Sequence, residues 1–524
     1  MQEKFRNLYI SISYNGVVRC YTVDNDSPST PQTGVQQPQL RKAMSLPLLW
    51  ALAAATILGP WLVMANWWFS LTGPSLSLAF FVTMLFMIPV GFCYSELAST
   101  LPYAGGSYNY IGHAFNHATA FLFSWSQTIS YFAVTAFNIL ATIWILQYAG
   151  IIPYGTTIVF AGITMGDPYL IAAGIAFAAF YAALNWFKVE LSAMVQFGLF
   201  WLLFITGIVW NGFDLFLSPN FSLGYFSNLF PYGATGFLVA TGVMVTMYFG
   251  FEVVANMAEE ANYPPKQMPL VVVGAIVTAG IVYIITLTAM AGTAPLDYLV
   301  GTANVPGEIV YLVHGHIPWA TIGWIGIVLG GIACALTCVD GFWLALSRLW
   351  YALGRANLFP KQFENLNKHK VPGIATLVIF IGLIPLIAFS GTSWIAMLFV
   401  LMGITIAIVY LGTTLSFIQL RRKHPEWVRP YKAPGGVLMG VLGLIGAGFC
   451  VIMTAVALTP VSVGGQYAGG WEGWIFLVVY MIVGTLVYLY MGQYRKSRNL
   501  QPVLCKEPAC VAEGLEHKTG PMKS

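Results

Sequence analysis

The stretch Thr56-Ile57-Leu58-Gly59-Pro60-Trp61 interrupts the first long apolar segment of the chain near its middle. Pro60 has no N–H group, so the carbonyl of Thr56 loses its helical partner, and Gly59 lets the backbone bend. Irregular backbone inside a bilayer persists only where it lines a cavity or is buried in protein. The stretch therefore predicts a membrane helix that is broken at a buried or cavity-lining position.

A second interruption, Tyr248-Phe249-Gly250-Phe251-Glu252, lies at a similar depth in the sixth apolar segment. A glycine that is followed by an intramembrane carboxylate is a stronger break signal than a glycine alone. Each break begins a block of five segments, and the two blocks cross the membrane in opposite directions. This arrangement is typical of inverted-repeat secondary transporters, in which both breaks meet near the midplane and form the binding site. The alternative is two ordinary kinks, because Gly and Pro are common in membrane helices.

Composition places most of the chain in a membrane. Of the 524 residues, 58% are hydrophobic and 8% are charged, which is not the composition of a soluble protein. About twelve stretches of about 20 apolar residues are long enough to cross a bilayer as helices. We place these spans at residues 45–69, 74–98, 118–146, 169–186, 191–211, 234–256, 268–291, 319–347, 372–391, 394–418, 436–459 and 473–492. The predicted fold class is an all-α integral membrane protein.

All 23 Lys and Arg residues fall on one side of this span pattern. The loops on the other side contain acidic residues but no Lys or Arg: Asp167, Asp214, Asp297, Glu308 and Glu472. Because positive residues stay on the side from which a chain is inserted, both termini are predicted in the cytoplasm of a cell-membrane protein. The net charge of +4 then reflects loops beside lipid headgroups, and no nucleic-acid partner is expected.

The span pattern also divides the chain into four parts. Residues 1–43 and 495–524 are expected to form flexible cytoplasmic tails, the first of them rich in Ser, Pro, Thr and Gln. Residues 44–418 are expected to form a transport core of ten helices, and residues 419–494 two additional helices. No cofactor and no metal site is expected. Cys334 and Cys338 share a helix face, but the packing of small side chains is the favoured interpretation over metal binding.

Several short motifs resemble the amino acid–polyamine–organocation superfamily of permeases. They are Tyr94-Ser95-Glu96-Leu97, 101–108, Gly250-Phe251-Glu252, 258–264, 347–355, Leu358-Phe359-Pro360 and Arg429-Pro430-Tyr431. Their order and positions carry the resemblance, which covers nearly the whole membrane portion. It implies a LeuT-like core, a 5+5 inverted repeat with broken helices 1 and 6, that works by alternating access. Members of this superfamily mostly move amino acids or amines, by proton or cation symport or by exchange.

The residues predicted to bind substrate lie at the two breaks and on the third helix. They are Thr56, Ile57, Leu58, Gly59, Trp61, Gln127, Tyr131, Tyr248, Phe249, Gly250 and Phe251. N–H groups at the start of the second half of helix 1 suit a carboxylate, and freed carbonyls at both breaks suit an ammonium group. Gln127 and Tyr131, one turn apart, either line the substrate path or form an interhelical hydrogen bond.

One departure from the family leaves the substrate class open. The family typically has a Gly-Ser-Gly-like segment in helix 1, where this chain has Leu58-Gly59-Pro60. Pro60 removes one donor, and Leu58 and Trp61 crowd the place of small residues. An organic amine without a carboxylate therefore stays open beside an amino acid.

Glu252 and Asp340 are the acidic residues deepest in the predicted spans. A carboxylate at the bilayer centre costs about 2.5–3.5 kcal/mol on insertion scales, so both are functional candidates. Burial disfavours the charged form, so Glu252 is expected to take up a proton and release it when solvated; the alternative is a structural hydrogen bond. Asp340 and Thr337, one turn away, are a candidate acceptor set for Na⁺ or a cationic substrate. The alternative for Asp340 is a buried ion pair with Arg348.

These observations predict a secondary active transporter of amino acids that uses alternating access and is coupled to H⁺ or Na⁺. The alternatives are a transporter or exchanger of organic amines or polyamines, and a membrane receptor without flux. An enzyme is not expected, because the sequence shows no metalloprotease motif and no nucleophile with a nearby base. Glu259 and Glu260, at the inner end of the sixth span, are expected to act at an inner gate or to anchor a loop.

Overall fold

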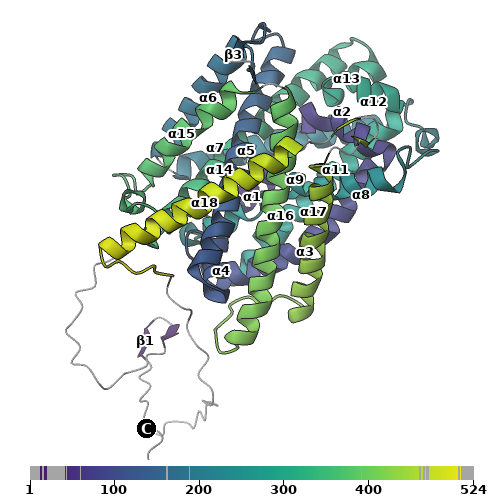
Figure 1. Cartoon of the computed structure of the whole chain (residues 1–524). Helices are drawn as coiled ribbons and strands as arrows, with labels where there is room; N and C mark the ends of the chain where they lie inside the picture. The colour runs from purple at the N-terminus through teal and green to yellow at the C-terminus, as the bar shows by residue number, and fades with distance from the viewer. Residues whose placement is uncertain are drawn as a thin grey trace, which may run out of the picture.

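The computed structural model describes residues 12–14, 17–19, 40, 42, 44–59, 61–160, 163–187, 189–390, 392–459, 462–463, 466–467, 471–505 and 508. Its secondary structure is almost wholly helical (Figure 1). The helices are α1 (Leu46–Ile57), α2 (Trp61–Thr72), α3 (Leu76–Thr100), α4 (Ser107–Ala114), α5 (His117–Tyr148), α6 (Pro168–Phe187), α7 (Val189–Ile208), α8 (Gly233–Val243), α9 (Val245–Tyr248), α10 (Val253–Asn256), α11 (Met268–Thr293), α12 (Leu296–Gly301), α13 (Val305–His314), α14 (Pro318–Arg355), α15 (Gly373–Ala388), α16 (Thr392–Lys423), α17 (Val437–Ala457) and α18 (Trp471–Ser497).

The described strands form three short antiparallel pairs outside the predicted spans. These are β1 (Ile12–Tyr14) with β2 (Val17–Arg19), β3 (Val159–Phe160) with β4 (Ile163–Thr164), and β5 (Ser462–Val463) with β6 (Gln466–Tyr467). The bundle itself is built of helices, because a helix satisfies its own backbone hydrogen bonds where water is absent. The expected all-α membrane fold is confirmed.

Within the described residues, ten helical segments are long and apolar enough to cross a membrane, and Leu46–Ile57 and Gly373–Ala388 are shorter apolar helices. The first predicted span, 45–69, covers Leu46–Ile57 and the start of Met64–Thr100, and each of the other predicted spans overlaps one of these segments. The chain is therefore a multi-pass membrane protein, while the count of twelve crossings and the four-part division of the chain stay predictions.

Burial separates the centre of the bundle from its edge. The most apolar windows of α5 and of the α8–α10 run are 83% and 89% buried, whereas that of α18 is 17% buried. Figure 1 shows α18, in yellow, crossing the bundle at a slant on its outer side. In the centre, α14 packs against α5, α7 and α1, and α11 packs against α3 and α1. The core thus surrounds the segments that contain the two sequence breaks.

Both predicted interruptions are present in the backbone. Helix α1 ends at Ile57 and α2 begins at Trp61, with Leu58 already outside helical geometry (φ −67°, ψ 75°). In the sixth span α9 ends at Tyr248, Phe249 is extended, and α10 does not begin until Val253. Gly250 has φ +135°, a conformation that residues with a side chain rarely adopt. Each break therefore occurs at the glycine that predicted it.

Three helices were not predicted, because each is too short to give a hydropathy signal. Helix α4 follows the second span, and α12 and α13 follow α11. Asn116 separates α4 from α5, and its side chain caps α5 by accepting the N–H of Thr119 at 2.9 Å. Helix α4 lies against α5 and α16.

Candidate functional site

The two breaks touch each other inside the bundle. A Cβ atom on Gly250 would lie 2.9 Å from the Ile57 nitrogen and 2.9 Å from the Thr56 carbonyl carbon. Only glycine allows two backbones to approach so closely at this point. Gly59 faces the same segment, because a Cβ atom there would lie 3.4 Å from Sδ of Met247. The polar groups released by both breaks are therefore close together in space.

The polar backbone of the helix 1 break is bound by a tyrosine from α11. The Leu58 N–H still belongs to α1, since it donates to the Ala54 carbonyl at 3.0 Å. The Gly59 N–H donates to the hydroxyl of Tyr283 at 2.7 Å and also lies 2.6 Å from the Ile57 carbonyl. The Tyr283 hydroxyl donates to that carbonyl at 3.0 Å. We call this pair of contacts the Tyr283 bridge.

Two thiols from α14 reach the remaining carbonyls of this break. The Cys338 thiol lies 3.3 Å from the carbonyl oxygen of Thr56, and the Cys334 thiol lies 3.0 Å from that of Gly59 and also contacts that of Leu58. Residues four apart share one helix face, so both thiols point the same way. The favoured interpretation as packing residues was therefore incomplete, because both also donate to the break. No group of three or more metal-ligating side chains occurs in the described part of the chain.

The helix 6 break is organised around Glu252. This side chain is fully buried, and its Oε2 atom accepts the Gly250 N–H at 3.0 Å and the Tyr410 hydroxyl at 2.8 Å. Oε1 has no hydrogen-bond partner among the described residues, although the Tyr131 hydroxyl is a further polar neighbour of the carboxyl group. The ring of Phe251 stacks on Tyr410 with centroids 5.0 Å apart. Glu252 thus turns back towards its own break.

Helix α5 contributes Gln127 and Tyr131 to the same place. The Gln127 amide donates to the Tyr131 hydroxyl at 2.8 Å, and the amide of Asn256 donates to it at 2.9 Å. The Tyr131 ring lies parallel to that of Phe249, with centroids 5.6 Å apart, and Phe342 closes on Phe249 at 4.4 Å. An interhelical hydrogen bond is present, as one interpretation held, and it lies directly beside the break.

Other predicted substrate residues turn away from the break or lie outside the described part. The Tyr248 hydroxyl donates to the Phe80 carbonyl at 2.9 Å, so it points towards α3. The Thr56 hydroxyl donates to the Leu52 carbonyl at 2.6 Å, within its own helix. Pro60 and the side chain of Trp61 lie outside the described residues.

Asp340 and Thr337 do not form the expected common set. The Thr337 hydroxyl donates to the Cys334 carbonyl at 2.7 Å and lies 3.4 Å from the Ala55 carbonyl, so it faces helix 1. The Asp340 carboxylate accepts amide N–H groups of Asn185 at 2.7 Å and Gln196 at 2.5 Å, so it faces α6 and α7. Residues three apart on a helix are neighbours, but here their side chains bind partners on different helices.

The expected ion pair between Arg348 and Asp340 was wrong. Arg348 binds Glu260 instead, with Nε 2.7 Å from Oε1 and Nη2 3.3 Å from Oε2. Both side chains are at most 2% exposed. Arg348 lies two turns beyond Asp340, where the end of the sixth span offers a nearer carboxylate.

A second ion pair beside the first ties four segments together. Glu259 binds Arg355 at 3.0 Å and accepts the backbone N–H groups of Leu40 at 3.3 Å and Ala104 at 3.1 Å. The segments before α1, after α3, after α10 and at the end of α14 therefore meet at these two glutamates. These contacts anchor the neighbouring loops, as one of the two expectations for Glu259 and Glu260 had it, and the inner-gate role stays a prediction.

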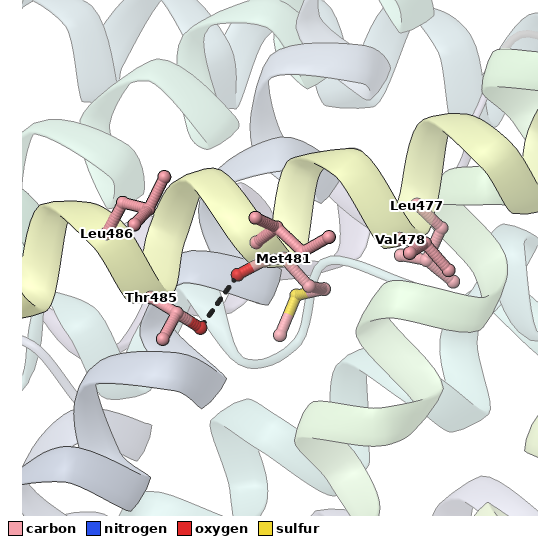
Figure 2. A pocket seen from close by; sticks show the side chains of 6 residues that line it. Leu477, Val478, Met481, Thr485 and Leu486 are labelled. Carbon is pink, nitrogen blue, oxygen red and sulfur yellow. Dashed lines mark hydrogen bonds between the residues drawn. The ribbon is translucent and has the colours of Figure 1, made fainter.

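A surface pocket lies apart from the breaks, along α18 (Figure 2). All of its lining residues belong to that helix: Leu477, Val478, Met481, Ile482, Thr485 and Leu486. The Thr485 hydroxyl donates to the Met481 carbonyl at 3.0 Å, which leaves an apolar surface. Because α18 is a peripheral span, this surface suits contact with lipid.

Comparison with known proteins supports the same class. The family model described as amino acid permease matches residues 48–485. The chain is 24% identical to the methylthioribose transporter of Bacillus subtilis, over 82% of this chain and 88% of that protein. It is 25% identical to the branched-chain amino acid permease BcaP of Lactococcus lactis, over 81% and 89%, and 24% identical to the aspartate-proton symporter of Bacillus subtilis, over 89% and 86%. The chain therefore belongs to the amino acid permease family of the amino acid–polyamine–organocation superfamily, and it is a transporter, not an enzyme.

Proposed function

We propose that this chain is a secondary active transporter of amino acids that works by alternating access and is driven by protons. The observation that carries the proposal is the contact between two broken helices with a buried carboxylate, Glu252, at the contact. We place the protein in the cell membrane with both termini in the cytoplasm, as the sorting of Lys and Arg residues supports.

The substrate chemistry follows from the polar groups at the breaks. An α-ammonium group would be accepted by backbone carbonyls such as that of Ile57, and an α-carboxylate would be bound by the Gly59 N–H and the start of α2. The ring pair of Tyr131 and Phe249 would cover the side chain of the substrate. Two of the relatives described above are named for amino acids, which supports this substrate class.

An organic amine remains the second candidate substrate. The Leu58 N–H donates to a carbonyl within α1, and Pro60 has no N–H group. Among residues 58–60, only the Gly59 N–H therefore donates to a partner from another helix. A site with few carboxylate donors suits a substrate without that group. One relative is named for methylthioribose, which is not an amino acid.

Proton coupling would use the unequal surroundings of the two Glu252 oxygens. Oε2 is held by the Gly250 N–H and the Tyr410 hydroxyl, so a proton would sit on Oε1 while the site is dry. Opening of the break to water would stabilise the carboxylate and release the proton. Because Glu252 binds the backbone of Gly250, the charge on this group and the shape of the break would change together.

Sodium coupling has less support from the same geometry. Carbonyls at the helix 1 break, which would be the ligands for a hard cation, already accept from the thiols of Cys334 and Cys338. Asp340 is turned towards α6 and α7, away from these carbonyls.

For alternating access, the Glu260–Arg348 and Glu259–Arg355 pairs would part when the site opens towards the cytoplasm.

The test is counterflow of radiolabelled amino acids and amines in liposomes that contain the purified protein. We expect exchange of at least one amino acid, and uptake that an inward proton gradient accelerates. Glu252→Gln should exchange substrate without responding to the gradient, while the control Glu472→Gln, at an exposed position, should respond as the wild type does. Gradient-driven uptake that is unchanged in Glu252→Gln would exclude the proton role. Binding without any exchange would favour a receptor instead of a carrier.

A further inference from the structure

The Tyr283 bridge joins two groups that an amino acid would need. Its oxygen accepts from the Gly59 N–H at 2.7 Å, and its proton goes to the Ile57 carbonyl at 3.0 Å. In the first contact the hydroxyl accepts a hydrogen bond, as a substrate carboxylate would. In the second it donates one, as a substrate ammonium group would. One hydroxyl thus makes both types of contact that an α-amino acid offers.

The tyrosine is firmly placed for this role. Its side chain is 1% exposed, and its ring is packed by Phe80 at 4.6 Å between centroids, with Tyr248 at 6.2 Å and Trp68 at 6.3 Å. A buried tyrosyl hydroxyl needs hydrogen-bond partners, and the break of helix 1 supplies both of them. The ring is therefore held by side chains of α3 and α2, and the hydroxyl forms its hydrogen bonds with the backbone of the helix 1 break.

We propose that the Tyr283 hydroxyl competes with substrate for the helix 1 break, so that only a zwitterionic amino acid replaces it at both ends. This inference rests on the proposed function. A carboxylate makes a stronger hydrogen bond with the Gly59 N–H than a neutral phenol does, and an ammonium group makes a stronger one with the Ile57 carbonyl. An amine without a carboxylate replaces the hydroxyl at Ile57 alone and leaves the Gly59 N–H with Tyr283. Tyr283 then lowers the affinity for amino acids, which replace both of its contacts, more than the affinity for their decarboxylated amines, which replace one.

The experiment measures binding to purified full-length protein for three matched pairs of compounds. The pairs are L-leucine with 3-methylbutylamine, L-arginine with agmatine, and L-serine with ethanolamine, which differ by the α-carboxylate. In Tyr283→Phe both competing contacts are gone, so we expect the amino acid that the wild type binds to bind about 30-fold tighter, the ratio for two neutral hydrogen bonds of ~1 kcal/mol each. The paired amine, which replaces only the contact at Ile57, should bind about fivefold tighter, the ratio for one such hydrogen bond. Tyr480→Phe, which removes a tyrosyl hydroxyl bound to the Trp125 carbonyl at 2.9 Å on peripheral α18, is the control and should change neither.

Equal or weaker amino acid binding in Tyr283→Phe would overturn the proposal. If that variant does not fold, 3-fluorotyrosine placed at position 283 retains the hydroxyl and reports its surroundings by ¹⁹F NMR. The resonance should shift when the bound amino acid is added, because the hydroxyl loses both contacts, and should shift less with the paired amine, which displaces one of them. No shift with the amino acid would overturn the proposal. If the wild type exchanges amino acids but the binding test or the ¹⁹F test contradicts the proposal, only the role of Tyr283 is rejected. Absence of binding and exchange for every amino acid in the wild type would reject the proposed function itself.

Discussion

Replacement of Gly250 by alanine tests whether the contact between the two breaks is needed. The new Cβ atom would lie 2.9 Å from both the Ile57 nitrogen and the Thr56 carbonyl carbon. These are backbone atoms, so they cannot turn aside as the end of a flexible side chain can. The φ of +135° adds strain of its own, because an alanine rarely adopts it.

The magnitude follows from two separate costs. Backbone strain in a glycine-only region costs about 1–3 kcal/mol, and overpacking a tight contact costs about 1–3 kcal/mol. Together they amount to about 2–6 kcal/mol, which is enough to push the breaks apart or to unfold much of the protein. We expect a lower midpoint of thermal denaturation and loss of counterflow in liposomes.

A matched variant separates the two costs. Gly233, at the start of α8, has φ +67°, and a Cβ atom there would meet nothing within 4 Å. Gly233→Ala therefore carries left-handed strain of about 1–2 kcal/mol without a clash. If Gly250→Ala lost no more stability than Gly233→Ala and still carried out counterflow, the two breaks would not need to touch, and the reasoning about the site would fail.

Three further predictions concern the contacts of Arg348, Cys338 and Cys505. Arg348→Met should lower the free energy of unfolding by about 3–5 kcal/mol because it leaves Glu260 buried without its partner. The double variant Arg348→Met/Glu260→Leu should restore most of the midpoint of thermal denaturation. An additive loss in the double variant would contradict this reasoning. Cys338→Ala should slow counterflow more than Cys338→Ser, since serine keeps a donor for the Thr56 carbonyl; equal rates would show that the thiol only fills space. Burial raises the pKa of the Cys505 thiol to about 12, so N-ethylmaleimide should alkylate this thiol slowly at neutral pH. Alkylation should be faster in Leu504→Asp, in which the segment no longer packs on Gly112. An unchanged rate would mean that Leu504 does not hold this segment.

The features of the site that the sequence could predict are those with a local signal. Gly59-Pro60 and Gly250 mark their own breaks, because the missing donor and the missing Cβ atom act at the residue that carries them. Glu252 marks itself as a carboxylate in an apolar span. None of these inferences required knowledge of which spans are neighbours. The break positions could therefore be placed to within a few residues.

The partners of these residues could not be predicted in the same way. Tyr283 is 224 residues from Gly59 in sequence, and Tyr410 is 158 residues from Glu252, so only the fold brings them together. A signal was nevertheless present, since a tyrosine within an apolar span needs a partner for its hydroxyl. The wrong pairing of Arg348 with Asp340 has the same origin. Closeness along one helix suggested that pair, whereas Glu260, 88 residues away, is the actual partner.

Several polar groups at the two breaks are already hydrogen-bonded within the protein, and this has a consequence for transport. The Gly59 N–H and Ile57 carbonyl are bound by Tyr283, and Oε2 of Glu252 is bound by Tyr410 and the Gly250 N–H. A substrate therefore gains only the difference between its own contacts and those that it replaces, not their full value. A carrier must release its substrate on the far side, so this reduced net affinity favours turnover. When the substrate leaves, the Tyr283 hydroxyl binds the Gly59 N–H and the Ile57 carbonyl again, so these two groups need no water.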